Sequence, residues 1–162
     1  MSAPITPIEI VNKALVMIGA LPITTFEETS AEAVVANQVY EDIVIDAIAQ
    51  HDWSFATGQK RLNRLSEVPL AQYSAAYQVP TNPKPVSFMR LWINKRLAPF
   101  EVSEDRVMCN AAFNDAVVLE YQFRAPENTW EPAFRWYVIY RLASEFASAI
   151  TRKEEMIQLW DG

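Results

Sequence analysis

Few side chains in this sequence are placed to carry out catalysis. His51 is the single histidine, and Asp52 follows it directly, but side chains one position apart in a helix do not face each other. His51 is better interpreted as a helix-terminal residue that the helix dipole favours. No serine stands in a G-x-S-x-G frame, and glycine occurs only at 19, 58 and 162, too few for a phosphate-binding loop. We therefore expect no enzymatic activity and no cofactor.

Carboxylates occur in three clusters, Glu27-Glu28, Glu41-Asp42-Asp46 and Glu154-Glu155. Two carboxylates can hydrolyse a glycosidic bond when they face each other across a pocket at a defined separation. These clusters fall on predicted helix surfaces and helix starts, where acids are solvated and favoured by the helix dipole, and we favour that interpretation. A carboxylate hydrolase is kept as a third hypothesis. Asp46 is its most interesting residue because it stands among isoleucines in the sequence.

A metal site is not expected either. Cys109 and His51 are the sole cysteine and histidine, so one chain cannot supply a zinc site built from these residue types. Cys109 follows Val107-Met108 and is expected to be a small buried apolar side chain.

Basic and aromatic side chains alternate in the middle of the chain. The cations are Lys60, Arg61, Arg64, Lys95 and Arg96, and the aromatic residues are Trp53, Phe55, Trp92 and Phe100. Such residues can bind single-stranded nucleic acid, with cations along the phosphates and bases stacked on the rings. They could instead pair across strands and pack their aliphatic stems in a small exposed sheet. A nucleic-acid-binding accessory protein is therefore the alternative function.

Composition and charge narrow the class of protein. The chain has 162 residues, 51% of them hydrophobic, which suits one domain with a substantial core. Residues 1–58 carry a charge of −7, 59–110 carry +4 and 111–162 carry −3, which gives the net charge of −6. The acidic total argues against a free nucleic-acid-binding domain, while the basic centre could meet an acidic partner.

No signal peptide or membrane span is recognised, so we expect a soluble protein made in a reducing compartment.

Two helices near the N-terminus have clear start signals. Thr6-Pro7-Ile8-Glu9 is a capping box with proline at the first helical position, and the apolar spacing that follows predicts a helix over 7–18, ended by Gly19. A second helix is expected to start at Thr29-Ser30-Ala31-Glu32 and to end near His51. Because the loop between them is short, the two helices are predicted to pack as an antiparallel hairpin.

A third helix is predicted from about Asn128 to about Ile150. Its expected buried stripe is Phe134, Val138, Leu142, Phe146 and Ala149, and a second apolar face contains Trp136, Tyr140 and Ala143. Two apolar faces require burial on two sides, so another helix or another subunit is expected to cover the second face. A fourth helix is predicted to begin at Thr151, with Met156, Ile157, Leu159 and Trp160 as its apolar residues.

The segment between the second and third helices favours strands and loops. Lys60–Leu65 alternates weakly, as an exposed strand does, and residues 66–86, which hold four prolines, are predicted to be a loop that contacts a partner. Further strands are predicted at 88–93, 98–102, 106–108 and 116–123, with turns at 94–96 and 103–105.

These elements together predict an α+β fold that is mainly α. It would be an antiparallel bundle of three or four helices with a small antiparallel β region inserted between helix 2 and helix 3. One domain, 1–162, would contain helical segments 1–56 and 127–162 and a β and loop insertion, 57–126.

Several motifs in order resemble one known family. The segment V-N-K-A-L-V-M-I-G ends in Gly19 and is followed by L-P-I-T-T-F, and the second predicted helix leads into His51-Asp52-Trp53-Ser54-Phe55. Near the end of the chain, a strand is followed by the helix start Glu131-Pro132 and an aromatic segment, Phe134–Val138. Over about residues 7–155 the chain resembles the tail tubular protein A family of short-tailed bacteriophages and the related head-to-tail adaptors (connectors) of other tailed phages and gene transfer agents.

The resemblance implies a structural virion protein of the neck or tail, assembled in the host cytoplasm. Members form a ring, typically a dodecamer, beneath the portal, contact a tail nozzle or tail-tube protein on the other side, and let DNA pass through the channel without sequence-specific binding. No membrane partner is implied. The residues that we assign to partner interfaces are Lys60, Arg61, Arg64, Trp92, Lys95, Arg96, Phe100, Met156, Leu159 and Trp160. Residues 59–110 would form the partner-specific surface, and the C-terminal helix would contact the portal.

Overall fold

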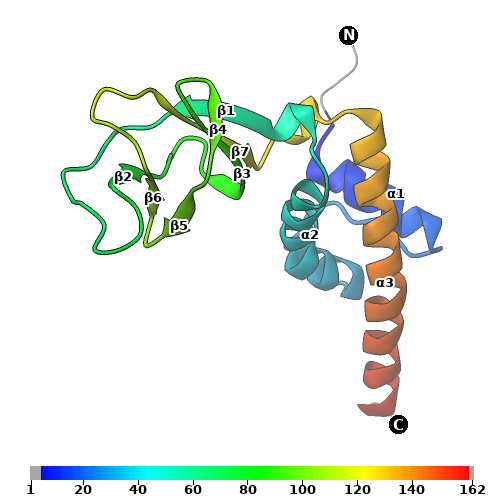
Figure 1. Cartoon of the computed structure of the whole chain (residues 1–162). Coiled ribbons are helices and arrows are strands. Elements are labelled where there is room, and N and C mark those ends of the chain that lie inside the picture. Colours follow the sequence, from blue (N-terminus) through cyan, green and yellow to red (C-terminus); the bar gives the residue numbers. More distant parts are fainter. Residues whose placement is uncertain (1–4, 161–162) are drawn as a thin grey trace. The chain divides into compact units, whose positions relative to one another are not determined.

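The computed structural model describes residues 5–160, apart from the side chains of Lys153, Glu154, Ile157 and Trp160. The chain divides into two compact units. The helical unit consists of Met1–His51 and Ala125–Gly162, and the β unit of Asp52–Arg124. Both units are coloured along the sequence in Figure 1.

The first two helices begin where their capping residues stand. In α1 (Pro7–Met17), the Thr6 hydroxyl oxygen accepts a hydrogen bond from the Glu9 amide at 3.2 Å. In α2 (Ala31–Gln50), the Ser30 hydroxyl oxygen accepts one from the Ala33 amide, also at 3.2 Å. Each cap satisfies an amide that has no carbonyl partner within the first turn. The predicted helix starts are therefore confirmed, and Gly19, at φ +74°, follows the end of α1 as expected.

Ser30→Ala is expected to destabilise the helical unit by about 1 kcal/mol, because the Ala33 amide then loses its acceptor. The loss can be measured by urea-induced unfolding followed through helical circular dichroism. Ser30→Asp, which restores an acceptor oxygen at the cap, is the control and should retain most of the stability.

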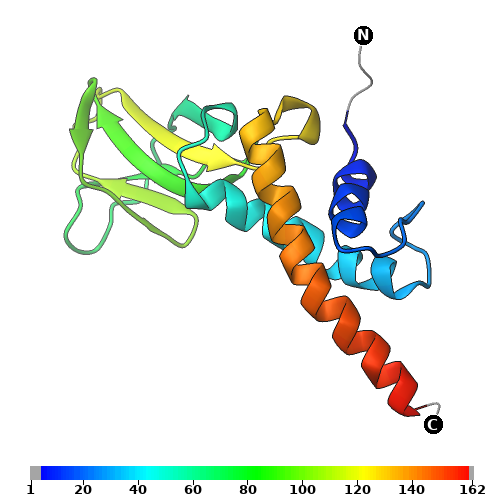
Figure 2. The same cartoon turned by 90° about the vertical axis from the view of Figure 1, so that its right-hand side faces the viewer.

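The third helix, α3 (Pro132–Trp160), is one continuous element of 29 residues. Figure 2 shows it running without a break to the C-terminal end of the described chain. The prediction of a third helix ending near Ile150 and a fourth starting at Thr151 is therefore wrong. No glycine or proline stands between Ala133 and Trp160, so nothing in the sequence interrupts the backbone hydrogen bonds.

Helix α3 is the element on which the helical unit is built. Both α1 and α2 pack mainly against α3 and only slightly against each other, so the prediction of a self-contained hairpin of the first two helices is wrong. The side chains of α3 that form this core are fully or almost fully buried: Phe134, Val138, Ile139, Leu142, Phe146 and Ile150. The link between α1 and α2, residues 18–30, is too long to force them into a hairpin, and α3 offers both helices a long apolar stripe. Ala149, predicted in that stripe, is partly buried.

The link between α1 and α2 is held by one polar side chain. The Asn12 amide nitrogen donates to the Ile23 carbonyl at 2.9 Å, and its oxygen accepts from the Ile23 amide at 2.8 Å. Ile23 is 3% exposed, so this pair of bonds lets the link bury an apolar side chain without leaving its backbone unpaired.

The β unit contains two antiparallel sheets. The four-stranded sheet has the order β1-β7-β3-β4 and the three-stranded sheet the order β2-β6-β5. Figure 1 shows β2, β6 and β5 side by side. The strands are β1 (Thr57–Arg61), β2 (Ala75–Gln78), β3 (Pro85–Ile93), β4 (Arg96–Ala98), β5 (Glu101–Ser103), β6 (Arg106–Cys109) and β7 (Val117–Phe123).

A second hydrophobic core forms within the β unit. Leu91, Leu119 and Tyr121 of the four-stranded sheet belong to one buried cluster with Tyr77 and Val107 of the three-stranded sheet. Cys109 is buried in the same cluster, as predicted, and burial raises the pKa of its thiol to about 11. The thiol is therefore protonated at neutral pH and poorly reactive.

The predicted fold class, a mainly α helical bundle, is wrong. The described chain is an α+β protein with three α-helices and seven strands in two sheets. Within the supposed loop 66–86, β2 forms between prolines, where its residues are free to pair with β6. The predicted strand 98–102 is instead divided between β4 and β5, which lie in different sheets, because Pro99 between them cannot donate a ladder hydrogen bond.

The two predicted turns are confirmed. Asn94 and Lys95, between β3 and β4, have φ of 49° and 68°, and Glu104 and Asp105, between β5 and β6, have φ of 53° and 60°. Two successive residues with positive φ match the twist of a two-residue hairpin. Among the described residues, no helix is both long and apolar enough to cross a membrane.

Candidate interaction surfaces

The helical unit has an apolar groove between α1 and the start of α3. Its volume is about 460 Å³, and we call it the helical groove; it is lined by Glu9, Asn12, Lys13, Val16, Met17 and Trp136. Val16 is 64% exposed, Met17 48% and Trp136 46%. Exposed methionine and tryptophan side chains in one hollow are typical of surfaces that bind another protein.

Aromatic packing and one cation give the helical groove a defined edge. The rings of Trp136 and Tyr140 lie 5.7 Å apart, and the Lys13 ammonium lies 5.9 Å from the centre of the Trp136 ring. Tyr140 is 57% exposed, so the second apolar face predicted for this helix is present but uncovered within the described helical unit. Ala143, predicted on the same face, is buried.

The C-terminal end of α3 has apolar side chains that the described helical unit leaves exposed. Met156 is 55% exposed and Leu159 80%. Figures 1 and 2 both show this end of α3 extending beyond α1 and α2. Met156 and Leu159 were predicted at a partner interface, and their exposure leaves them accessible; the side chain of Trp160, the third residue predicted there, lies outside the described residues.

In the β unit, one face of the four-stranded sheet combines charged and apolar side chains. Paired residues in an antiparallel sheet point to the same side. Gln59, Glu120 and Arg90 are aligned in one row of the sheet, and the next row is Arg61, Val118, Trp92 and Leu97. We call these two rows the outer sheet face, because Leu91, Leu119 and the other core residues point to the opposite side.

An ion pair organises the outer sheet face. The Arg90 Nε donates to Glu120 Oε2 at 2.8 Å, and the Trp92 indole nitrogen donates to the same oxygen at 3.4 Å. The Arg90 guanidinium also lies 3.9 Å from an Asp52 carboxylate oxygen. The hydrogen bond from Arg90, with a smaller contribution from Trp92, lowers the pKa of Glu120 against the opposing effect of burial. Arg90 is therefore paired with carboxylates and is not free to hold a phosphate.

The lowered pKa of Glu120 makes the stability of the β unit depend on pH. A depressed pKa stabilises the folded state above the unfolded pKa of a glutamate, about 4.3, and this contribution is lost as the pH falls through the folded value. We expect Glu120→Gln to lower stability at pH 7 and to differ less from the unsubstituted protein at pH 3. Denaturant titrations at the two pH values measure this, with Glu101→Gln, an exposed carboxylate in the same unit, as the control.

Comparison with known proteins adds no family. No protein-family model matches the chain, and no curated protein matches it. The resemblance to head-to-tail adaptors therefore remains a prediction from sequence motifs.

The predicted basic residues are not brought together into one patch. Lys60 and Arg61 are consecutive on β1, so their side chains leave opposite sides of the sheet, and the Lys60 ammonium donates to the Asn82 carbonyl. Arg64 donates to the Ala111 carbonyl at 3.2 Å and lies over the rings of Tyr77 and Phe113. Lys95 lies in the β3–β4 turn and Arg96 at the start of β4, both exposed.

The predicted aromatic residues also separate. Trp92 lies on the outer sheet face beside Arg90 and Glu120, whereas Phe100 packs against the buried core of the β unit. Trp53 and Phe55 lie together near the start of the β unit, with ring centres 6.0 Å apart. Of the aromatic residues considered for stacking with bases, Trp92 is the one that the sheet places in a row with a cation, Arg61.

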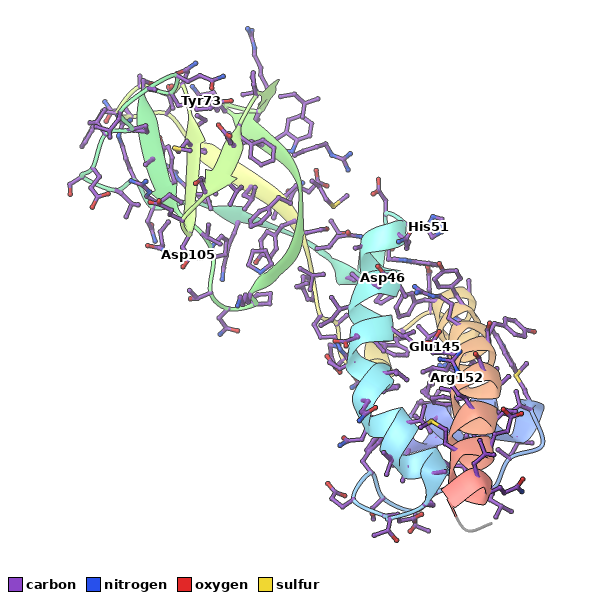
Figure 3. The ribbon with its side chains drawn as sticks, turned by 90° about the horizontal axis from the view of Figure 1, so that it is seen from below. Asp46, His51, Tyr73, Asp105, Glu145 and Arg152 are labelled. Carbon is purple, nitrogen blue, oxygen red and sulfur yellow. The ribbon has the colours of Figure 1, made fainter. Side chains whose placement is uncertain are left out.

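The helical residues that could have done chemistry have structural partners. Asp46 accepts a hydrogen bond from Arg141 at 2.6 Å, and the His51 ring packs edge-on against Tyr137 at 5.9 Å. Figure 3 shows Asp46 and His51 on the side of α2 that faces α3. Among the described residues, no three His, Cys, Asp or Glu side chains are grouped so that they could hold a metal ion.

Sequence reasoning missed the helical groove and the Arg90–Glu120 pair. Val16 and Met17 directly follow the buried Leu15 but lie off the buried stripe of α1. Two apolar residues in that position could have indicated an exposed apolar surface. The sequence did predict that Trp136 belongs to a second apolar face of its helix. It did not predict that Val16 and Met17 of α1 would line the same groove. The Arg90–Glu120 pair depends on the register between β3 and β7, which are separated by 23 residues of chain.

Proposed function

We propose that this chain is a structural virion protein, the subunit of a head-to-tail adaptor ring. The ring would join a portal to a tail nozzle or tail tube and line the channel through which DNA leaves the head. The observation that most supports an assembly role is the helical groove, where Val16, Met17 and Trp136 expose apolar surface suited to a protein partner. The resemblance of the sequence motifs is what suggests this particular assembly.

A ring subunit needs two unlike surfaces, one for each neighbour, because a head-to-tail contact joins different patches. The helical unit carries two such surfaces: the helical groove and the end of α3 with Met156 and Leu159. Their separation along one long helix suits contacts with two different neighbours.

The distribution of charge also suits pairing between copies. The helical unit has five basic and thirteen acidic residues, a net charge of −8, and the β unit has nine basic and seven acidic residues, a net charge of +2. The opposite net charges reduce repulsion between copies wherever the β unit of one copy lies near the helical unit of another. An acidic subunit is compatible with a DNA channel, because DNA that must slide should not be held by many phosphate contacts.

The test is assembly of the full chain with a portal protein, examined by sedimentation velocity and negative-stain electron microscopy. We expect the chain to form a ring, predicted to contain twelve copies, that binds one end of the portal. A chain that stays monomeric and never joins portal complexes contradicts the proposal.

The second candidate is a nucleic-acid-binding accessory protein. Arg61 and Trp92 favour it, because they flank Val118 in one row of the outer sheet face and could hold a phosphate and a stacked base. A shift assay with single-stranded DNA at increasing salt separates the two functions. Tight binding that weakens steeply with salt and is lost in Arg61→Ala would favour the accessory protein.

A further inference from the structure

The end of α3 cannot reach the helical groove of its own chain. Trp136, which lines the groove, and Met156 are twenty positions apart on the same continuous helix. At a rise of 1.5 Å per residue this separates them by about 30 Å. Any contact between the exposed end of α3 and a helical groove must therefore join two copies of the chain.

The end of α3 also presents apolar surface that the described helical unit leaves uncovered. Figures 1 and 2 show it beyond α1 and α2, and Thr151, Arg152, Glu155, Met156, Gln158 and Leu159 are all exposed. Most of the stability of a helix in a protein comes from burying an apolar stripe against other elements. Met156 and Leu159, three positions apart, form such a stripe on one face.

The two surfaces carry complementary side chains at matching spacing. Along α1, Glu9, Lys13 and Val16 follow one another as acid, base and apolar residue at positions i, i+4 and i+7. Along the end of α3, Arg152, Glu155 and Leu159 follow as base, acid and apolar residue at i, i+3 and i+7. These positions lie on one side of a helix in each case. With the two helices parallel, each charge meets its opposite and Leu159 meets Val16; the antiparallel arrangement would place Leu159 against Glu9.

From this match we propose that the end of α3 of one copy docks, parallel to α1, in the helical groove of a second copy. Arg152 pairs with Glu9 of the neighbour, Glu155 with Lys13, and Leu159 with Met156 enters the hollow beside Val16 and Met17. Every copy has one groove and one helix end, so the contact is head-to-tail and leads to a ring or a filament. The closure of this series of contacts into a ring rests on the proposed function. The docking of α3 in the helical groove is the contact that would hold neighbouring copies together.

The test is disulfide trapping between two single-cysteine substitutions in full-length chains carrying different tags. Val16→Cys and Leu159→Cys are mixed and oxidised, and the cross-linked product is quantified by mass; the native Cys109 is buried in the β unit. We expect a cross-linked heterodimer at least tenfold more abundant than in the control, in which Gln158→Cys replaces Leu159→Cys. Gln158 is exposed on the same helix end but is one position away from the docking stripe.

A charge exchange provides a second measurement. Arg152→Glu is expected to weaken self-association measured by sedimentation, and adding Glu9→Arg to the same chain is expected to restore it.

If rings form on the portal but the Val16–Leu159 cross-link does not exceed the control, the docking proposal is overturned and the adaptor proposal survives. If neither rings nor the cross-link form, both proposals are overturned. A strong cross-link without portal binding supports the docking contact and contradicts the adaptor role.

Discussion

Val16→Glu is expected to weaken self-association of the chain by about a hundredfold, which is roughly 2.7 kcal/mol of binding free energy. Val16 is 64% exposed in the helical groove, so the glutamate is solvated in the monomer and costs little stability there. In the docked arrangement it would face Leu159 and would compete with Glu155 of the neighbour for Lys13, so its desolvation and the added like charge oppose association. Sedimentation velocity over a range of protein concentrations measures the change.

Leu70→Glu is the matched control for this prediction. Leu70 is a fully exposed apolar residue of the β unit, so the same kind of substitution adds the same charge away from the groove. It should leave self-association within about threefold of the unsubstituted protein, the range expected for a surface charge outside an interface. Equal loss in both variants would assign the effect to net charge and contradict a role of the helical groove.

Phe146→Ala is expected to destabilise the helical unit by about 3–5 kcal/mol, the cost of removing a buried aromatic side chain and leaving a cavity. Phe146 is 0% exposed and belongs to the buried stripe of α3, the helix on which both α1 and α2 pack. Loss of this ring therefore affects the support of both shorter helices together. Urea-induced unfolding followed by helical circular dichroism gives the free energy of unfolding.

Leu159→Ala tests the same helix at an exposed position. Leu159 is 80% exposed, so its truncation should change the free energy of unfolding of the monomer by less than about 0.5 kcal/mol. A similar loss in Leu159→Ala and Phe146→Ala would mean that the end of α3 is folded against the rest of the helical unit.

The two units give these experiments separate readouts. The helical core and the core of the β unit are formed by different side chains, so a change in one core need not alter the unfolding of the other. Helical circular dichroism follows the unit that contains α1, α2 and α3, while the pH dependence of Glu120 belongs to the β unit. A variant such as Phe146→Ala can therefore be distinguished from Glu120→Gln by which transition it shifts.

The sequence by itself determined the features that depend on neighbouring residues. The Thr6 and Ser30 caps act on amides three positions away, and the predicted turns at 94–96 and 103–105 are present, with positive φ at 94–95 and 104–105. The buried stripe of α3 follows from spacing along one helix, as does its exposed second face with Trp136 and Tyr140. Each of these signals lies within a few residues and does not depend on the rest of the fold.

The tertiary structure decided what depends on partners distant in the sequence. β2 forms among prolines because β6, about thirty positions away, supplies its hydrogen bonds, and the separation of β4 from β5 depends on which sheet each joins. Glu120 pairs with Arg90 through strand register, and Val16 and Trp136 line one groove because α1 packs on α3. Local propensity cannot specify these contacts, because each is stabilised by burial and pairing that exist only once the distant segment is in place.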